Sequence, residues 1–175
     1  RIGLADMLAA IAHRLGLAAV GVAPQEEAGL FPLRLPRVLL SLAVGAALAA
    51  SGAAMQGLFR NPLADPGLVG VSSGAALAAV ATIVLGDKVL HLLDAAARPW
   101  ALPAAAFVGG LAATALVRRF GLRDGRASVA TILLAGVAIN ALCAAGIGFL
   151  TFVADEQQLR SLVFWTMGSL GAATW

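Results

Sequence analysis

The sequence predicts an all-α membrane protein, a polytopic transmembrane helical bundle to which this chain contributes about four spans plus interfacial helices. The chain is 61% hydrophobic and only 12% charged, with a mean hydropathy of +0.92, far from the balance of a soluble domain. Its 20 glycines suit helices that pack closely in a membrane. Four long apolar segments in 175 residues leave too little polar surface for a soluble protein with buried helices.

Residues 1–34 are predicted to lie at the membrane surface rather than to cross it. Apolar residues recur at helical spacing from Leu4 to Leu15, which predicts an amphipathic helix with Asp6 in its first turn and Gly16 at its end. Residues 18–30 are more polar and are predicted to form a loop.

The first predicted span covers residues 38–59, and these 22 residues would be roughly 33 Å long, which matches a bilayer core. It follows the basic stretch Arg34–Arg37 and precedes the polar turn Arg60–Pro66. Pro62 fixes its own φ and biases Asn61 away from helical conformation, so the helix should end at this turn.

Three further spans are predicted over residues 68–85, 102–117 and 129–153. Small residues recur four positions apart in all four spans, which favours close contacts between neighbouring helices. Residues 86–98 should form a polar connection. Residues 154–175 are predicted to be a second interfacial segment, in which Val163-Phe164-Trp165 would anchor the chain at the bilayer surface.

The orientation in the membrane is only weakly indicated by charge. Basic residues near the spans divide evenly between the two sides, so the positive-inside rule does not decide. The dense basic cluster in residues 117–127 favours a cytoplasmic location for its side. The interfacial segments 1–34 and 154–175 would then be external, together with Arg34 and Arg37.

Six motifs follow one another in a fixed order along the chain. They are Arg34–Arg37, Gly45–Gln56, Arg60–Pro66, Gly70–Ala75, Leu133–Val137 and Trp165–Ser169. Together they resemble the permease subunits of type II bacterial ABC importers for metal chelates, the FecCD family, which carries ferric siderophores, heme and vitamin B12. Asp124–Arg126, Ala138–Leu142 and Phe164–Gly168 look most similar to heme permeases within this family.

The resemblance implies a fragment of a longer permease, containing its second to fifth membrane helices, in the bacterial inner (cytoplasmic) membrane. It also implies a homodimer that works with two ATPase subunits and a periplasmic substrate-binding protein. The chain has no G-x-x-x-x-G-K-[ST] loop. We therefore expect no enzyme activity and no cofactor in this chain, with ATP and Mg²⁺ bound by the ATPase subunits.

The resemblance also suggests roles for individual residues. Arg34 and Arg37 match positions that bind acidic residues of the binding protein, although on residue type alone they could simply snorkel at a helix end. Asn61, Pro62 and Leu63 match part of a cytoplasmic gate, although Asn-Pro is also a common turn.

Four further residues complete the predicted site. Val129 and Ala130 stand where the cobalamin member of the family has small hydroxyl residues of the gate, which is a departure from that pattern. Asn140 is interpreted either as part of the translocation pathway or as a hydrogen-bonding residue between helices. Arg160 is assigned to the pathway as well.

The predicted function is passage of heme (iron-porphyrin) from periplasm to cytoplasm, and the alternative within the family is a ferric-siderophore or cobalamin permease. An ion-coupled secondary transporter would need ionisable residues inside its spans, and the four predicted spans contain no charged side chain. A purely structural scaffold would not explain the polar turn at Asn61 or the external arginines. Nucleic acid is not an expected partner, because no basic stripe with interleaved aromatics is present. The single Cys143 excludes a disulfide framework and a cysteine metal motif within this chain.

Overall fold

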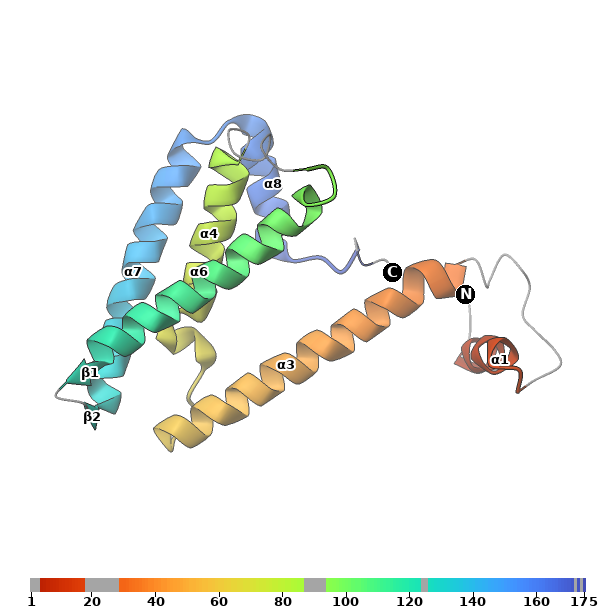
Figure 1. Ribbon diagram of the computed structural model, residues 1–175, viewed down its shortest axis with the longest axis horizontal. Helices are drawn as coiled ribbons and strands as arrows, with labels where there is room; N and C mark the ends of the chain where they lie inside the picture. Colours follow the sequence, from red (N-terminus) through yellow and green to blue (C-terminus); the bar gives the residue numbers. More distant parts are fainter. Residues whose placement is uncertain (1–3, 18–28, 87–93, 124–125, 172, 174) are drawn as a thin grey trace. The chain divides into compact units, whose positions relative to one another are not determined.

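The computed structural model describes residues 4–17, 29–86, 94–123, 126–171, 173 and 175, and Figure 1 shows their helices. The predicted all-α fold is confirmed. Within the described residues the exceptions are β1 (Leu122–Arg123) and β2 (Arg126–Ala127), which pair antiparallel with Leu122 opposite Ala127. The chain forms two compact units, residues 1–49 with 169–175 and residues 50–168, which we describe separately as unit 1 and unit 2.

Unit 1 contains α1 (Leu4–Arg14), the π-helical turn η1 (Leu30–Arg34) and the first half of α3 (Leu35–Phe59). The amphipathic helix predicted near the N-terminus is therefore present as α1. Phe31 connects three segments of this unit: the Arg14 guanidinium lies 4.3 Å from the centre of its ring, and its carbonyl oxygen accepts a hydrogen bond from Trp175 Nε1 (2.9 Å). Most of the predicted loop, residues 18–28, lies outside the described residues.

The first predicted span is confirmed as a helix, since α3 ends at Phe59 as the Asn-Pro turn requires. With η1 it forms a helical stretch of 30 residues, and none of its most apolar window is buried against the described chain.

Unit 2 is built on α4 (Val71–Leu85), α6 (Arg98–Gly121) and α7 (Val129–Val153), which pack side by side. The α4 and α6 backbones meet at Gly74 and Gly109, where a Cβ on either residue would overlap the other's carbonyl oxygen. Gly136 of α7 lies directly against the carbonyl oxygen of Leu68. Small residues thus bring these backbones together, as expected for membrane helices.

The second predicted span requires a correction at its start. The segment from residue 68 does not begin as one helix, because a 3-10 turn, η2 (Pro66–Val69), is followed by Gly70 in the left-handed region (φ 80°). Helix α4 begins only at Val71 and has 15 residues, about 22 Å, which is shorter than a bilayer core of about 30 Å.

The three other predicted spans are long enough and apolar enough to cross a bilayer, and among the described residues they are the only helices that are. The third predicted span, 102–117, lies within α6, which extends from Arg98 to Gly121 and carries arginines at both ends. Pro99 lies in its first turn, where the missing N–H costs little. Pro103 is accommodated inside the helix, which membrane helices tolerate.

Helix α8 (Glu156–Met167) forms most of the C-terminal interfacial segment within unit 2. It begins with a capping box in which Asp155 accepts from the Gln158 N–H (2.8 Å) and Gln158 Oε1 accepts from the Asp155 N–H (3.1 Å). Gln158 Nε2 also donates to the Val84 carbonyl at the end of α4 (3.2 Å). Leu162 packs with Val80 and Val84, so α8 is fixed against α4.

The glycine contacts of α7 predict that alanine destabilises the protein at Gly136 but not at Gly148. Gly136→Ala should lower the stability of the purified permease by about 1–3 kcal/mol, because the new methyl group overlaps the Leu68 carbonyl. Gly148→Ala is the matched control, since no described atom lies within 4 Å of its Cβ position and alanine favours a helix. Thermal unfolding in detergent measures both. Equal stability of the two variants would contradict the close contact at Gly136.

Candidate functional site

The turn between α3 and η2 is held by the side chains of its own polar residues. Asn61 Oδ1 accepts a hydrogen bond from the Leu63 N–H (2.9 Å), and the Asn61 carbonyl accepts one from the Ala64 N–H (3.1 Å). Asp65 caps η2 by accepting from the Gly67 N–H (2.7 Å), with Pro66 at the first helical position. Arg60 begins the turn with a φ of 48°. These local bonds fix the backbone from the end of α3 to η2.

Leu63 and Ala64 occupy opposite environments within this turn. Leu63 is 86% exposed, whereas Ala64 is only 7% exposed. Ala64 belongs to a buried cluster that joins the turn to α6 and α7. Its other members are Phe59, Val69, Ala113, Val117, Ile139 and Cys143. The turn is thus anchored through Ala64 and presents Leu63 outward, as a large apolar side chain without cover from the described residues.

Val129 and Ala130 are the first two residues of α7, and both are exposed. Ile132, half a turn further on, packs against the buried cluster that contains Ala64. The structure therefore brings the start of α7 and the Asn61–Leu63 turn to the same region of unit 2. Their joint role as a gate stays a prediction.

Asn140 uses both ends of its side-chain amide within unit 2. Its Nδ2 donates to the Gly67 carbonyl of η2 (3.1 Å), and its Oδ1 accepts from the Ser73 hydroxyl of α4. This geometry matches the hydrogen-bonding interpretation of Asn140. Sequence reasoning missed Ser73 and Gly67, because a serine or a glycine in an apolar segment carries no sign of its partner.

Arg160 lies on α8, where its guanidinium is 3.5 Å from the Glu156 carboxylate in an exposed pair one turn apart. Such surface pairs contribute little stability. Among the described residues no hydrogen bond or ion pair joins Arg160 to Asn140, so a shared translocation pathway stays a prediction for both.

The two arginines predicted to dock a partner differ in their surroundings. Both belong to unit 1, Arg34 as the last residue of η1 and Arg37 in the first turn of α3. Arg37 Nη2 donates to the Gly171 carbonyl (2.8 Å) and so ties the C-terminal segment to α3. Arg34 is exposed and forms no hydrogen bond or ion pair with the described part of the chain. Its charge is therefore the freer of the two.

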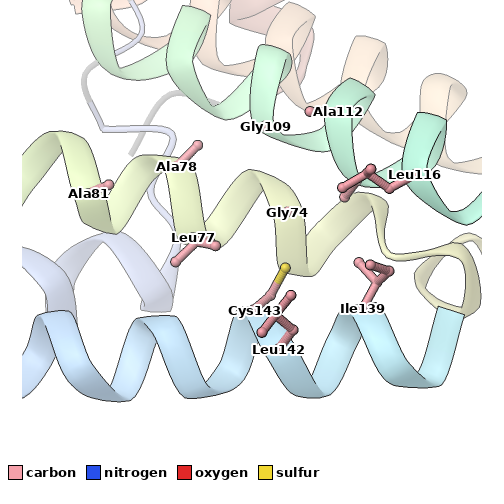
Figure 2. A pocket seen from close by; sticks show the side chains of 11 residues that line it. Gly74, Leu77, Ala78, Ala81, Gly109, Ala112, Leu116, Ile139, Leu142 and Cys143 are labelled. Atoms are coloured by element: carbon pink, nitrogen blue, oxygen red, sulfur yellow. The ribbon is translucent and has the colours of Figure 1, made fainter. Parts of the chain in front are cut away.

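A cavity of about 290 Å³ lies between α4, α6 and α7, and Figure 2 shows the Cys143 sulfur pointing from α7 toward α4. Its lining consists of small or aliphatic residues and one thiol. They are Gly74, Leu77, Ala78, Ala81, Gly109, Ala112, Ala113, Leu116, Ile139, Leu142 and Cys143. No charged or amide group is present in this lining to orient a polar ligand. We interpret the cavity as a packing groove between helices.

Known proteins resemble this chain over most of its length. The hemin transport system permease protein HmuU of Yersinia pestis is 52% identical over 143 residues, which are 82% of this chain and 41% of the relative. The vitamin B12 import system permease protein BtuC of Escherichia coli O1:K1 / APEC is 42% identical over 152 residues, 87% of this chain and 44% of the relative. This chain thus spans less than half the length of these relatives.

A solved structure shares the fold. It is an inward-facing conformation of a metal-chelate type ABC transporter, matched with a TM-score of 0.72 and 31% identity over 98% of this chain and 51% of the other. The model of the FecCD transport family matches residues 1–175. The apolar helices and these permease relatives together indicate a multi-pass membrane protein. The chain belongs to the FecCD transport family.

Proposed function

We propose that this chain is part of the permease subunit of an ATP-driven importer that moves heme across the bacterial inner membrane into the cytoplasm. The observation that carries the proposal is the 52% identity to a hemin permease, compared with 42% to a vitamin B12 permease. The working unit would be a permease homodimer with two ATPase subunits and a periplasmic substrate-binding protein. A ferric-siderophore or cobalamin permease is the second candidate, supported by the BtuC match.

The apolar character of the spans agrees with passage rather than storage of a metal chelate. The helices α3, α4 and α7 contain no histidine, no tyrosine and no charged side chain past their first turns. Histidine, tyrosine, cysteine thiolate and methionine are the usual protein ligands of heme iron. Cys143 is buried among aliphatic side chains, and Met55 of α3 packs against the same buried cluster. A pathway past these helices would release its cargo without breaking a strong bond to iron.

The exposed turn fits a constriction that opens and closes. In a symmetric dimer every surface occurs twice around the axis. Two copies of Leu63, each presented outward on a turn fixed by hydrogen bonds, would place matching apolar side chains near one another. Arg34, in the turn that precedes α3, would offer an acidic partner a positive charge that forms no ion pair with the described residues.

The transport proposal predicts uptake of heme by the full-length permease with its ATPase and binding protein in proteoliposomes. Heme should accumulate only with ATP, and an excess of cobalamin or of a ferric siderophore should not compete. The amount of substrate inside the liposomes is measured by scintillation counting of labelled substrate or by absorbance. Preferential uptake of cobalamin or the siderophore would replace heme with the second candidate. No ATP-dependent uptake of any of the three would overturn the proposed function.

Leu63→Ala should raise substrate leak in the absence of ATP, with the free energy of unfolding changed by no more than about 0.5 kcal/mol. Val117→Ala is the buried comparison, since Val117 is 1% exposed, and it should lower stability by about 1–3 kcal/mol. Leak from heme-loaded liposomes, measured beside thermal unfolding, separates the two effects. A destabilised but non-leaky Leu63→Ala would remove this turn from the gate.

Arg34→Glu should weaken docking of the binding protein by about two- to 100-fold, as expected for loss of one interfacial charge contact. Arg37→Glu should weaken docking too, and it should also lower stability because the bond to Gly171 is lost. Arg119→Glu is the control. Arg119 is an exposed cation in the last turn of α6, and its replacement should leave the affinity for the binding protein unchanged. Surface plasmon resonance with the complex in nanodiscs measures the affinity. Equal affinity of Arg34→Glu and wild type would contradict a docking role for Arg34 and favour the alternative that it snorkels at the helix end.

A further inference from the structure

The Gly67 carbonyl is the point where the turn region meets the helices of unit 2. It accepts two hydrogen bonds, one from the Gly70 N–H (3.1 Å) and one from Asn140 Nδ2 (3.1 Å). Gly67 is in turn connected to the turn through Asp65, whose side chain accepts from the Gly67 N–H (2.7 Å). Hydrogen bonds therefore connect Asp65, near the end of the turn, through Gly67 to Asn140 in the middle of α7.

Asn140 has little freedom to leave this position. Its oxygen accepts from the Ser73 hydroxyl, which also lies 3.1 Å from the Gly70 carbonyl. A half-buried amide in a membrane protein is costly unless its polar atoms are paired. Both ends of this amide are paired here, one to η2 and one to α4, so one side chain of α7 holds two separate segments.

Packing enforces the same arrangement independently of the hydrogen bonds. Gly136, one turn before Asn140, lies against the Leu68 carbonyl, and a Cβ on Gly70 would lie 3.3 Å from Ile139 Cγ2. The η2 backbone is thus pressed onto α7 over one full turn of the helix. Any shift of α7 along its axis would break the Asn140 bonds and the glycine contact together.

We propose that Asn140, with Ser73, is a positioning residue that holds the Asn61–Pro66 turn in register with α7. This assignment deepens the proposed function, because the turn affects transport only as a gate. Asn140 acts here through Gly67 and the turn rather than by touching the substrate. Movement of α7 would accordingly be transmitted to Leu63 at the tip of the turn.

Thiol reactivity at Ala64 reports directly whether the turn stays in place. The experiment uses the full-length complex in nanodiscs. Its permease carries the substitution Ala64→Cys, and Cys143 and any other native cysteine are replaced by alanine. Because Ala64 is 7% exposed, a methanethiosulfonate reagent reaches the new thiol only when the turn lifts away. Asn140→Ala should raise the reaction rate about tenfold and Ser73→Ala about threefold, as expected for loss of two bonds and of one.

Two controls separate positioning from general loss of structure. Thr151→Ala removes a hydroxyl of α7 whose bond, to the Ile147 carbonyl, stays within the helix, and it should leave the reaction rate of the Ala64→Cys thiol unchanged. A second reporter, Val80→Cys, tests a buried site in the separate cluster with Leu162. Its rate should not respond to Asn140→Ala.

The proposal is overturned if Asn140→Ala leaves the rate of the Ala64→Cys reporter unchanged, or if it raises the rates of the Ala64→Cys and Val80→Cys reporters equally. Should Asn140→Ala fail to fold, Ser73→Ala alone decides by the same two rates. The thiol rates require no substrate, so they stand apart from the transport assay. Absence of heme uptake with a tenfold rise at the Ala64→Cys reporter would reject the proposed function and keep the positioning role.

Discussion

The close approach of helix backbones in unit 2 is the constraint on which the rest of the described structure depends. Gly74 and Gly109 let α4 and α6 touch, and Gly136 lets α7 touch the carbonyl of Leu68. In a bilayer, apolar side chains gain little by leaving lipid for protein, so dense packing of small residues must supply much of the association. Close packing also brings backbone carbonyls within reach of side chains on neighbouring helices. The hydrogen bond from Asn140 to Gly67 follows from that proximity.

Much of the fold could be predicted from sequence because the deciding signals are local. Pro62 and Asn61 terminate α3 regardless of what surrounds it, and the long apolar segments identify α6 and α7. The Asp155-x-x-Gln158 spacing is a capping box that a closer analysis of the sequence could have found. The motif Gly70–Ala75 placed the start of this helix within one residue of Val71, where α4 begins. Hydropathy alone extended the predicted span back to residue 68, because it does not reveal the 3-10 turn Pro66–Val69.

The candidate site was only partly predictable, because its geometry depends on partners far apart in the sequence. The sequence singled out Asn140 as a polar residue in mid-span, but its two partners become evident only when α7 lies beside η2 and α4. Arg34 and Arg37 are alike in sequence and differ in structure, since only Arg37 reaches the Gly171 carbonyl. Leu63 and Ala64 are neighbours with opposite exposure, which hydropathy cannot distinguish.

The long helices α3, α6 and α7 and the shorter α4 have apolar interiors, and their charged side chains lie only in the terminal turns of α3 and α6. Between their ends these helices carry small and aliphatic residues, and the polar side chains within them bond to the protein itself, as Asn140, Thr82 and Thr151 do. If the proposed cargo, a metal chelate, passes along α3, α4 and α7, it meets no histidine, tyrosine or charged side chain past the first turns of these helices. Under the proposed function, selectivity would depend on residues outside the apolar helix interiors, where we propose that Arg34 meets a charged partner and that Leu63 restricts passage. The contacts of Asn140 with Gly67 and Ser73 connect the turn region to the middle of α7 and to α4, so this half-buried amide serves to hold neighbouring segments together.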